Sequence, residues 1–184
     1  MRIVRFLVVG SSVALFAAGA AIPASAAPTD DTATTFAVLA GTLDIDAAAT
    51  ADLGTGAPGA DITGSLGAVT VSDTRAAADA SWETSVASTD FTTGGATAPE
   101  TVLASEVDYW SGAATATTGT GTFTPAQATA GAAVPLSVTV PITAFTHTGG
   151  TGNDTATWAP TLIVNLPLDS QAGTYTGTVT HSVA

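Results

Sequence analysis

The feature that most constrains the fold is a two-residue alternation of apolar and hydroxyl side chains near the end of the chain. In residues 173–183, GTYTGTVTHSV, one parity carries Tyr175, Val179, His181 and Val183, and the other carries only threonine and serine. Successive side chains of a β-strand point to opposite faces of a sheet, so this spacing predicts a strand with one buried and one solvated face.

A second alternating stretch is residues 134–144, VPLSVTVPITA. Its apolar parity is uninterrupted and consists of Val134, Leu136, Val138, Val140 and Ile142. Pro135 and Pro141 lie on the other parity, and proline cannot donate a hydrogen bond to a neighbouring strand. The segment is therefore predicted to be an edge strand or a bulged strand.

Shorter alternations at residues 67–73, 81–88 and 161–167 are separated by breaks rich in glycine and aspartate. At residues 36–46 the apolar parity shifts at Gly41, which predicts a β-bulge. Together these segments predict an all-β fold, a Greek-key-like antiparallel β-sandwich of about seven to nine strands. Tyr175, two residues after a glycine, is either a tyrosine corner of such a sandwich or a core-facing aromatic.

The first residues predict a secretory signal helix. Arg2 and Arg5 form a basic start, residues 6–22 are apolar, and Ala24 and Ala26 are the small residues of a cleavage site after Ala26. We therefore expect a signal peptide at residues 1–26, a short flexible segment at 27–35 and a single domain at 36–184. The mature protein is expected outside the cell and not in the membrane.

Charge and cysteine content narrow the possible partners. Cleavage would change the formal net charge from −12 to −14 and leave Arg75 as the only arginine in a chain without lysine. Such an acidic surface repels phosphate backbones, which excludes nucleic acid as a partner. The chain has no cysteine, so packing and backbone pairing alone must hold it together.

Catalytic and metal sites find little support in the residue pattern. Neither His147 nor His181 lies near a recognisable nucleophile motif, so we expect no catalytic residues, no enzyme activity and no cofactor. Calcium is the most plausible metal for an acidic extracellular chain, but the candidate donors are better explained as solvated turn residues, and no metal site is expected. These donors are Asp30, Asp31, Asp44, Asp46, Asn153 and Asp154.

A glycan-contacting surface has one candidate. Tyr109 and Trp110 follow Glu106 in the segment SEVDYWSG, and aromatic rings beside carboxylates are typical of sugar-binding platforms. The alternative for this pair is packing inside the sandwich. Core packing is favoured for Trp82 and Trp158, which share a parity with apolar neighbours.

The order of several segments is similar to that of a known family. Residues 41–45 (GTLDI), 64–75 (GSLGAVTVSDTR), 81–92 (SWETSVASTDFT) and 172–184 (AGTYTGTVTHSVA) follow one another. Over most of residues 36–184 this order resembles the WxL domain, a secreted cell-wall-binding module of Gram-positive bacteria, in a form similar to secreted actinobacterial proteins.

The resemblance places residues 82–84 (WET) at the first W-x-L motif and residues 181–183 (HSV) at the second. Threonine replaces leucine in the first, and histidine and valine replace tryptophan and leucine in the second. The resemblance implies a sandwich that attaches non-covalently to peptidoglycan. It makes Trp82 and His181 candidate wall-binding residues, in addition to Tyr109 and Trp110.

Asp73 and Arg75 share a strand face, and we expect them to pair and fix the turn that leads to Trp82.

The favoured function is a non-catalytic secreted surface module that binds peptidoglycan or another surface protein. The alternative is a structural subunit that self-assembles through its strand edges, and a secreted hydrolase ranks third.

Overall fold

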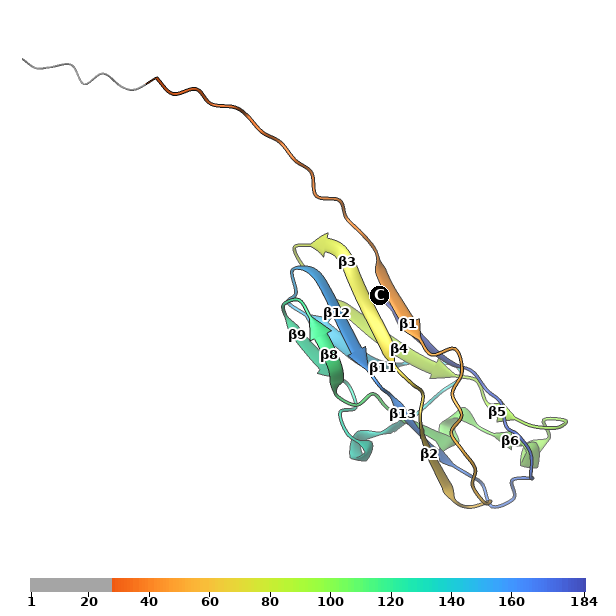
Figure 1. Cartoon of the computed structure of the whole chain (residues 1–184). Coiled ribbons are helices and arrows are strands. Elements are labelled where there is room, and N and C mark those ends of the chain that lie inside the picture. The colour runs from red at the N-terminus through yellow and green to blue at the C-terminus, as the bar shows by residue number, and fades with distance from the viewer. Residues whose placement is uncertain (1–27) are drawn as a thin grey trace, which may run out of the picture. The chain divides into compact units, whose positions relative to one another are not determined.

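The structure is a computed structural model that describes residues 28–184, so the predicted signal helix lies outside the described residues. The chain divides into two units, Met1–Phe36 and Ala37–Ala184, and every strand belongs to the second (Figure 1). Residues 28–35 have no regular structure and are exposed. No helix among the described residues is long and apolar enough to span a membrane.

Fourteen strands form three four-stranded antiparallel sheets and one small pair. The first sheet contains, in order, β1 (Leu43–Ala47), β3 (Val69–Ala77), β12 (Gly152–Trp158) and β8 (Ala114–Thr118). The second contains β10 (Val134–Pro135), β7 (Val107–Trp110), β13 (Thr161–Asn165) and β2 (Asp61–Ser65). The third contains β14 (Val179–Val183), β4 (Trp82–Ser88), β11 (Ile142–Thr148) and β9 (Thr122–Pro125), while β5 (Phe91–Thr92) pairs with β6 (Thr101–Val102).

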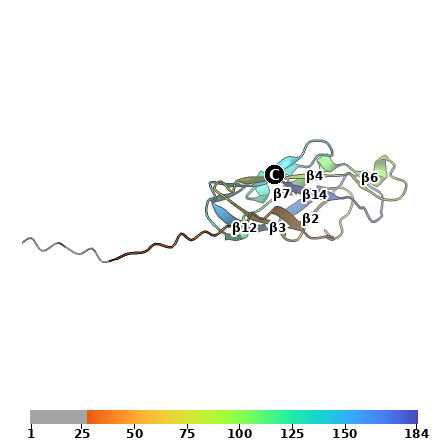
Figure 2. The ribbon, with the colours of Figure 1, turned by 90° about the horizontal axis from the view of Figure 1, so that it is seen from above.

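The three sheets make two layers. Only short breaks separate β3, β12 and β8 of the first sheet from β2, β13 and β7 of the second, so the two sheets continue each other (Figure 1). The third sheet packs across both, and Figure 2 shows β3 and β12 on one side of the sandwich and β4 on the other. Connections such as β3 to β4 and β11 to β12 cross between the layers, as in Greek-key sandwiches. The predicted all-β sandwich is therefore confirmed.

Two apolar clusters lie between the layers. One cluster joins the first sheet to the third and contains Val69, Val71, Trp82, Phe145, Ala156 and Trp158. The other joins the second sheet to the third and contains Val86, Val102, Ala104, Val107, Tyr109, Leu136, Ala144, Leu162 and Val164. The predicted faces of residues 67–73, 81–88 and 161–167 are confirmed, since their apolar parity supplies buried members of these clusters.

The described residues contain fourteen strands where about seven to nine were expected, and the segment 134–144 explains part of the difference. The predicted single strand is broken between β10 and β11, where Ser137 Oγ accepts the backbone N–H groups of Thr139 at 3.2 Å and Val140 at 3.1 Å. Val138 and Val140 are consequently exposed. The two prolines withhold donors from the sheet, and a serine hydroxyl that bonds locally favours a turn over a strand.

The start of the domain also differs. Residues 36–41 belong to no strand, and β1 begins at Leu43. The predicted irregularity at Gly41 is present: Gly41 N donates to Thr74 O and Thr74 N donates to Thr42 O, each at 2.8 Å. Gly41 and Thr42 thus both lie opposite Thr74, and two residues opposite one is the pattern of a β-bulge. A Cβ at Gly41 would collide with the Thr74 side chain.

Helices are limited to three short 3-10 turns among the described residues, η1 (Ala98–Glu100), η2 (Ala104–Glu106) and η3 (Ala130–Ala132). The first lies beside Tyr175, which decides between the two interpretations of that residue. Tyr175 Oη is 2.9 Å from Gln171 O and 3.0 Å from Pro99 O, so the phenol bonds to backbone as in a tyrosine corner.

Replacing Tyr175 by Phe should lower the free energy of unfolding by about 1 kcal/mol, because the partly buried Pro99 carbonyl and the exposed Gln171 carbonyl lose their shared donor while the ring is kept. Urea unfolding followed by tryptophan fluorescence measures this. The control is Thr34→Val, which removes an exposed hydroxyl outside the sheets. Equal stability of both variants would contradict the structural role of the phenol.

Candidate functional site

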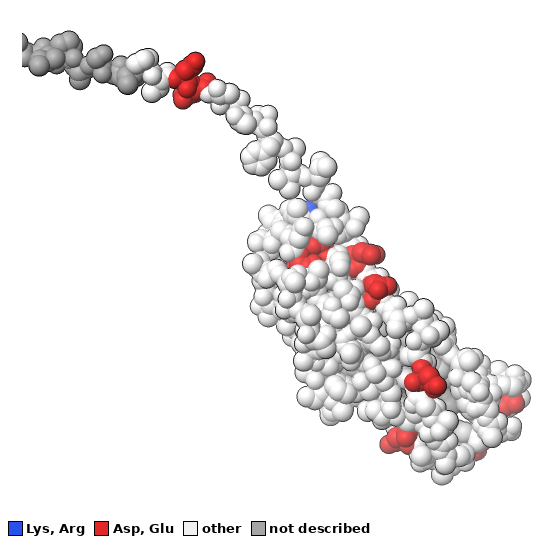
Figure 3. Space-filling view, viewed as in Figure 1, with Lys and Arg blue, Asp and Glu red and all other residues white. Residues whose placement is uncertain are grey.

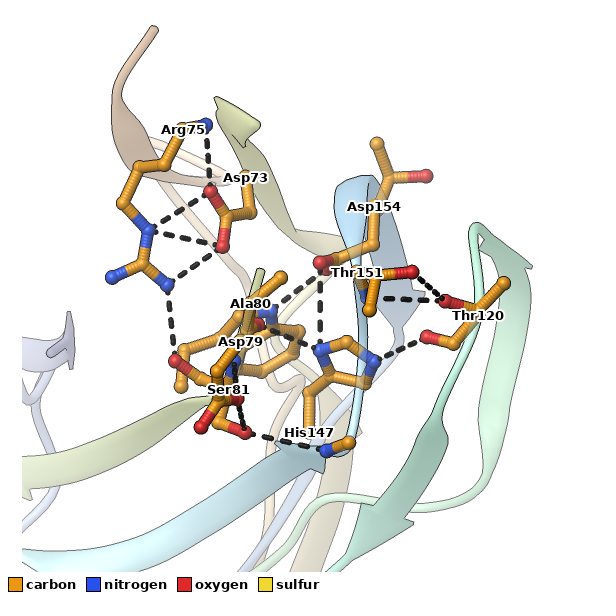
Figure 4. Close-up of polar contacts among 12 residues, drawn as sticks. Asp73, Arg75, Asp79, Ala80, Ser81, Thr120, His147, Thr151 and Asp154 are labelled. Atoms are coloured by element: carbon orange, nitrogen blue, oxygen red, sulfur yellow. Dashed lines mark hydrogen bonds and ion pairs between the residues drawn. The ribbon is translucent and has the colours of Figure 1, made fainter. Parts of the chain in front are cut away.

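One group of charged and polar side chains is gathered at the end of the sandwich where β3, β4, β11 and β12 meet (Figure 4). We call Asp73, Arg75, Trp82, His147 and Asp154 the polar cluster. Asp73, His147 and Asp154 are buried, with 0%, 0% and 2% of their surface exposed. A buried histidine beside carboxylates is the arrangement in the described residues that most resembles a catalytic site, so its geometry decides what it can do.

Asp73 and Arg75 form the predicted pair. Arg75 Nε donates to Asp73 Oδ1 at 2.9 Å, and Arg75 Nη2 donates to Asp73 Oδ2 at 2.6 Å. The same Nη2 donates to Ser81 O at 3.0 Å, across the turn that precedes Trp82. The guanidinium thus bridges Asp73 and the turn, and its fixing of this turn stays a prediction. The hydrogen bond from Arg75 lowers the pKa of Asp73, although burial of the carboxylate opposes the shift.

Trp82 is anchored by the other carboxylate. Its Nε1 donates to Asp154 Oδ1 at 2.8 Å, and Asp154 Oδ2 lies 3.5 Å from His147 Nδ1. The indole ring also packs on Phe145, with 6.3 Å between the ring centroids. Trp82 is only 4% exposed, so the prediction that it contacts cell wall is wrong, because the residue is committed to the core.

His147 has no free ring nitrogen. Its Nδ1 is 3.0 Å from Ala80 O and its Nε2 is 2.8 Å from Thr120 O. Both partners are backbone carbonyl oxygens, and the ring itself is fully buried. The ring also stacks on Phe123 at 4.2 Å. Both nitrogens of the buried ring thus face backbone carbonyls and not a nucleophilic side chain or solvent, so the polar cluster is a closed structural element.

The remaining aromatic candidates continue inward from the polar cluster. Phe145 stacks on Trp158 at 4.9 Å, and Trp158 Nε1 donates to Tyr109 Oη at 3.4 Å. Tyr109 Oη then lies 3.2 Å from His181 Nε2. Because the tyrosine oxygen receives the indole N–H, its own hydrogen is available to His181, whose Nε2 accepts it. Tyr109 is fully buried, so its predicted role as a glycan contact is also wrong.

His181 is partly buried on β14, beside Tyr109. Burial lowers its pKa from 6.5 to about 4, because a charged imidazolium loses its hydration there. Burial also raises the pKa of Tyr109, although the hydrogen bond from Trp158 opposes that shift. The pair is therefore neutral at pH 7, and neither group is poised for proton transfer near that pH.

Trp110 is the predicted glycan contact that the structure leaves partly exposed on an outer face. It lies on β7 opposite Thr161 of β13, and the next residues of the same face, Asp108 and Ile163, are also opposite each other. Asn165 Nδ2 donates to Asp108 Oδ2 at 3.0 Å. The face thus combines an aromatic ring with an amide, a carboxylate and a hydroxyl, a set of groups that suits contact with sugars.

Other carboxylates are dispersed. No group of three or more metal-binding side chains occurs among residues 28–184. Figure 3 shows acidic residues scattered over the visible face, with a single basic spot, which belongs to Arg75 as the only lysine or arginine in the described part of the chain. Glu100 caps η1 through Thr97, and Glu83 accepts the hydroxyl of Thr143 at 3.1 Å, so neither faces the other across a cleft.

Sequence reasoning missed the roles of His147 and Asp154. His147 precedes a glycine-rich stretch of the sequence, yet it is a buried residue of β11 with the same parity as Phe145. Asp154 was considered only as a calcium donor. The available signal was that both polar residues interrupt the buried parity of a strand, which requires a buried partner for each.

The ion pair at Arg75 can be tested by stability. Arg75→Ala should lower the free energy of unfolding by about 1–3 kcal/mol, because Asp73 stays buried without its fork of donors. Arg75→Lys keeps the charge but not the fork that also reaches Ser81, so about half of that loss is expected. Urea unfolding gives both values. A loss below about 0.5 kcal/mol for Arg75→Ala would contradict the structural role.

His181 makes stability depend on pH. Its folded-state pKa lies below its ordinary value, so the unfolded chain takes up the proton first as pH falls. Stability should therefore decrease between about pH 6.5 and about pH 4, by at most about 1.4 kcal/mol per pH unit from this group. His181→Gln keeps an acceptor for Tyr109 but does not titrate. The free energy of unfolding should change less with pH over this range in the variant than in the unchanged chain. Equal slopes of stability against pH would contradict the assignment.

The comparisons with known proteins do not assign this chain to a family. A scan against protein-family models finds no match for this chain, and a search of curated proteins finds none. The resemblance to the WxL domain therefore stays a prediction, and the function has to be argued from the residues and their arrangement.

Proposed function

We propose that this chain is a non-catalytic, exported module of the bacterial cell surface that attaches non-covalently to peptidoglycan. The observation that carries the proposal is the closed geometry of the polar cluster. The one place in the described residues where a histidine meets carboxylates has both imidazole nitrogens bound to carbonyls. A hydrolase base must lie within hydrogen-bond reach of the proton that it abstracts, and both nitrogens of this buried histidine face backbone carbonyls instead.

The wall contact is proposed for the outer face around Trp110. Tyr109 and Trp82 are buried, and His181 is bonded to Tyr109. Trp110 keeps partial exposure beside Asp108 and Thr161. The exposed part of the Trp110 ring contributes apolar area, since its Nε1 is buried, and the polar groups for sugar hydroxyls come from Asp108 and Thr161.

Charge favours an uncharged target. After removal of the predicted leader the formal net charge is −14, with one arginine that is already paired to Asp73. A surface of this kind repels anionic wall polymers unless divalent cations intervene. The neutral glycan strands of peptidoglycan, or a protein exposed on the wall, are the partners that fit.

The test is co-sedimentation of the exported protein with purified cell-wall sacculi. The protein is recovered from the medium of a Gram-positive expression host, and its N-terminus is read by mass spectrometry to locate the cleavage site. Binding should be saturable with and without calcium. Trp110→Ala should weaken it by about tenfold or more, as expected for an aromatic contact residue.

Leu168→Ala is the matched control, because Leu168 is an exposed apolar residue outside the sheets and outside the proposed contact face. It should bind sacculi like the unchanged chain. Failure of the unchanged chain to bind in either condition would overturn the wall-binding proposal, and equal binding by Trp110→Ala would overturn the assignment of the contact face.

A further inference from the structure

The chain exposes an unusual amount of apolar side chain just before β1. We call residues 34–40, TTFAVLA, the apolar segment. Phe36, Val38 and Leu39 are 91%, 76% and 85% exposed, and the segment belongs to no strand. Burying such side chains is favourable in proportion to the apolar area removed from water, so the segment can contribute to the binding of a partner.

The composition of the apolar segment is that of a β-strand without a partner. It contains no charged residue, glycine or proline, and threonine, phenylalanine and valine favour extended backbone. Short uncharged windows of this kind readily pair with a free sheet edge. Phe36, Val38 and Ala40 alternate, so they would lie on the same face of a strand.

β14 offers a matching edge. It pairs with β4 on one side and has no second strand partner in the part of the chain that the structure describes. Glu83 and Ala184 exchange both backbone hydrogen bonds, at 2.9 and 3.0 Å. In an antiparallel ladder the bonding direction alternates, so Val179, His181 and Val183 point their N–H and C=O groups away from β4.

The other edges are less suitable. β1 carries Asp44 and Asp46, β2 begins with Asp61, and β9 and β10 each contain a proline, devices that block strand addition. β8 is uncharged, but its residues are only alanine and threonine. Val179 and Val183 of β14 instead reach the two apolar clusters, so a strand added there would extend both.

The apolar segment is poorly placed to pair with the free edge of β14 in its own copy of the chain. β1 follows the apolar segment after two residues, Gly41 and Thr42, and both are bonded to Thr74. A reversal of the chain toward its own β14 would have to occur within these residues and break those bonds. A second copy carries no such restriction.

We propose that the apolar segment of one copy adds as a β-strand to the free edge of β14 in a second copy. Backbone hydrogen bonds would give affinity, and Phe36 and Val38 would pack beside Val179 and Val183, as in other cases of β-strand addition. One-way donation produces chains of copies and mutual donation produces a dimer. This inference does not rest on wall binding.

The experiment is size-exclusion chromatography with light scattering on the exported protein over a range of concentrations. Phe36→Asp removes the main apolar contact of the donor, and Thr180→Lys places a charge on β14 at an exposed position. Each should weaken association by about tenfold or more. Leu168→Asp, at a residue 86% exposed outside the proposed contact, is the matched control and should associate like the unchanged chain.

Mixing the two variants gives a decisive outcome. Thr180→Lys keeps an intact donor and Phe36→Asp keeps an intact acceptor, so the mixture should recover a heterodimer that neither forms alone. A monomeric unchanged chain, or full association of Phe36→Asp, would overturn the proposal. Loss in Phe36→Asp without loss in Thr180→Lys would overturn β14 as the acceptor.

Discussion

The structure depends on the burial of two carboxylates, Asp73 and Asp154, at one end of a sandwich that has very few cations. Removing a carboxylate from water costs several kcal/mol unless donors replace the lost hydration. Arg75 supplies a fork to Asp73, and Trp82 donates to Asp154 Oδ1, while Asp154 Oδ2 lies 3.5 Å from His147 Nδ1 without a hydrogen bond. These contacts connect the turn between β3 and β4 with the end of β11, because the residues come from all these elements.

From that end a line of aromatic contacts runs into the sandwich. Trp82 packs on Phe145, Phe145 stacks on Trp158, and Trp158 reaches His181 through the Tyr109 hydroxyl. The line crosses from the first apolar cluster to the second, and so it joins the two halves of a long sandwich. In a chain without cysteine, large rings with satisfied polar atoms supply the cross-linking that disulfides give many secreted domains.

The use of polar side chains within the fold limits which surfaces can bind other molecules. Each histidine and most buried polar atoms are used by the fold, and the contacts with other molecules that we propose lie on the outer face around Trp110 and at the edge of β14. An acidic shell keeps copies apart in general. Association is then favoured only where both partners are neutral, which is the case for the apolar segment and for β14.

The sequence by itself determined the fold class and the inward face of most strands, because the two-residue period is a local property of an extended chain. It also determined the Asp73–Arg75 pair, since residues two apart on a strand lie on one face. It failed at residues 134–144, where a local hydroxyl turn overrides the alternation. Only the tertiary structure decided that Asp154 meets Trp82, 72 residues away, and that Tyr109 and not Trp110 is buried. Those outcomes depend on which layers face each other, and no local pattern records a contact between strands so far apart in the chain.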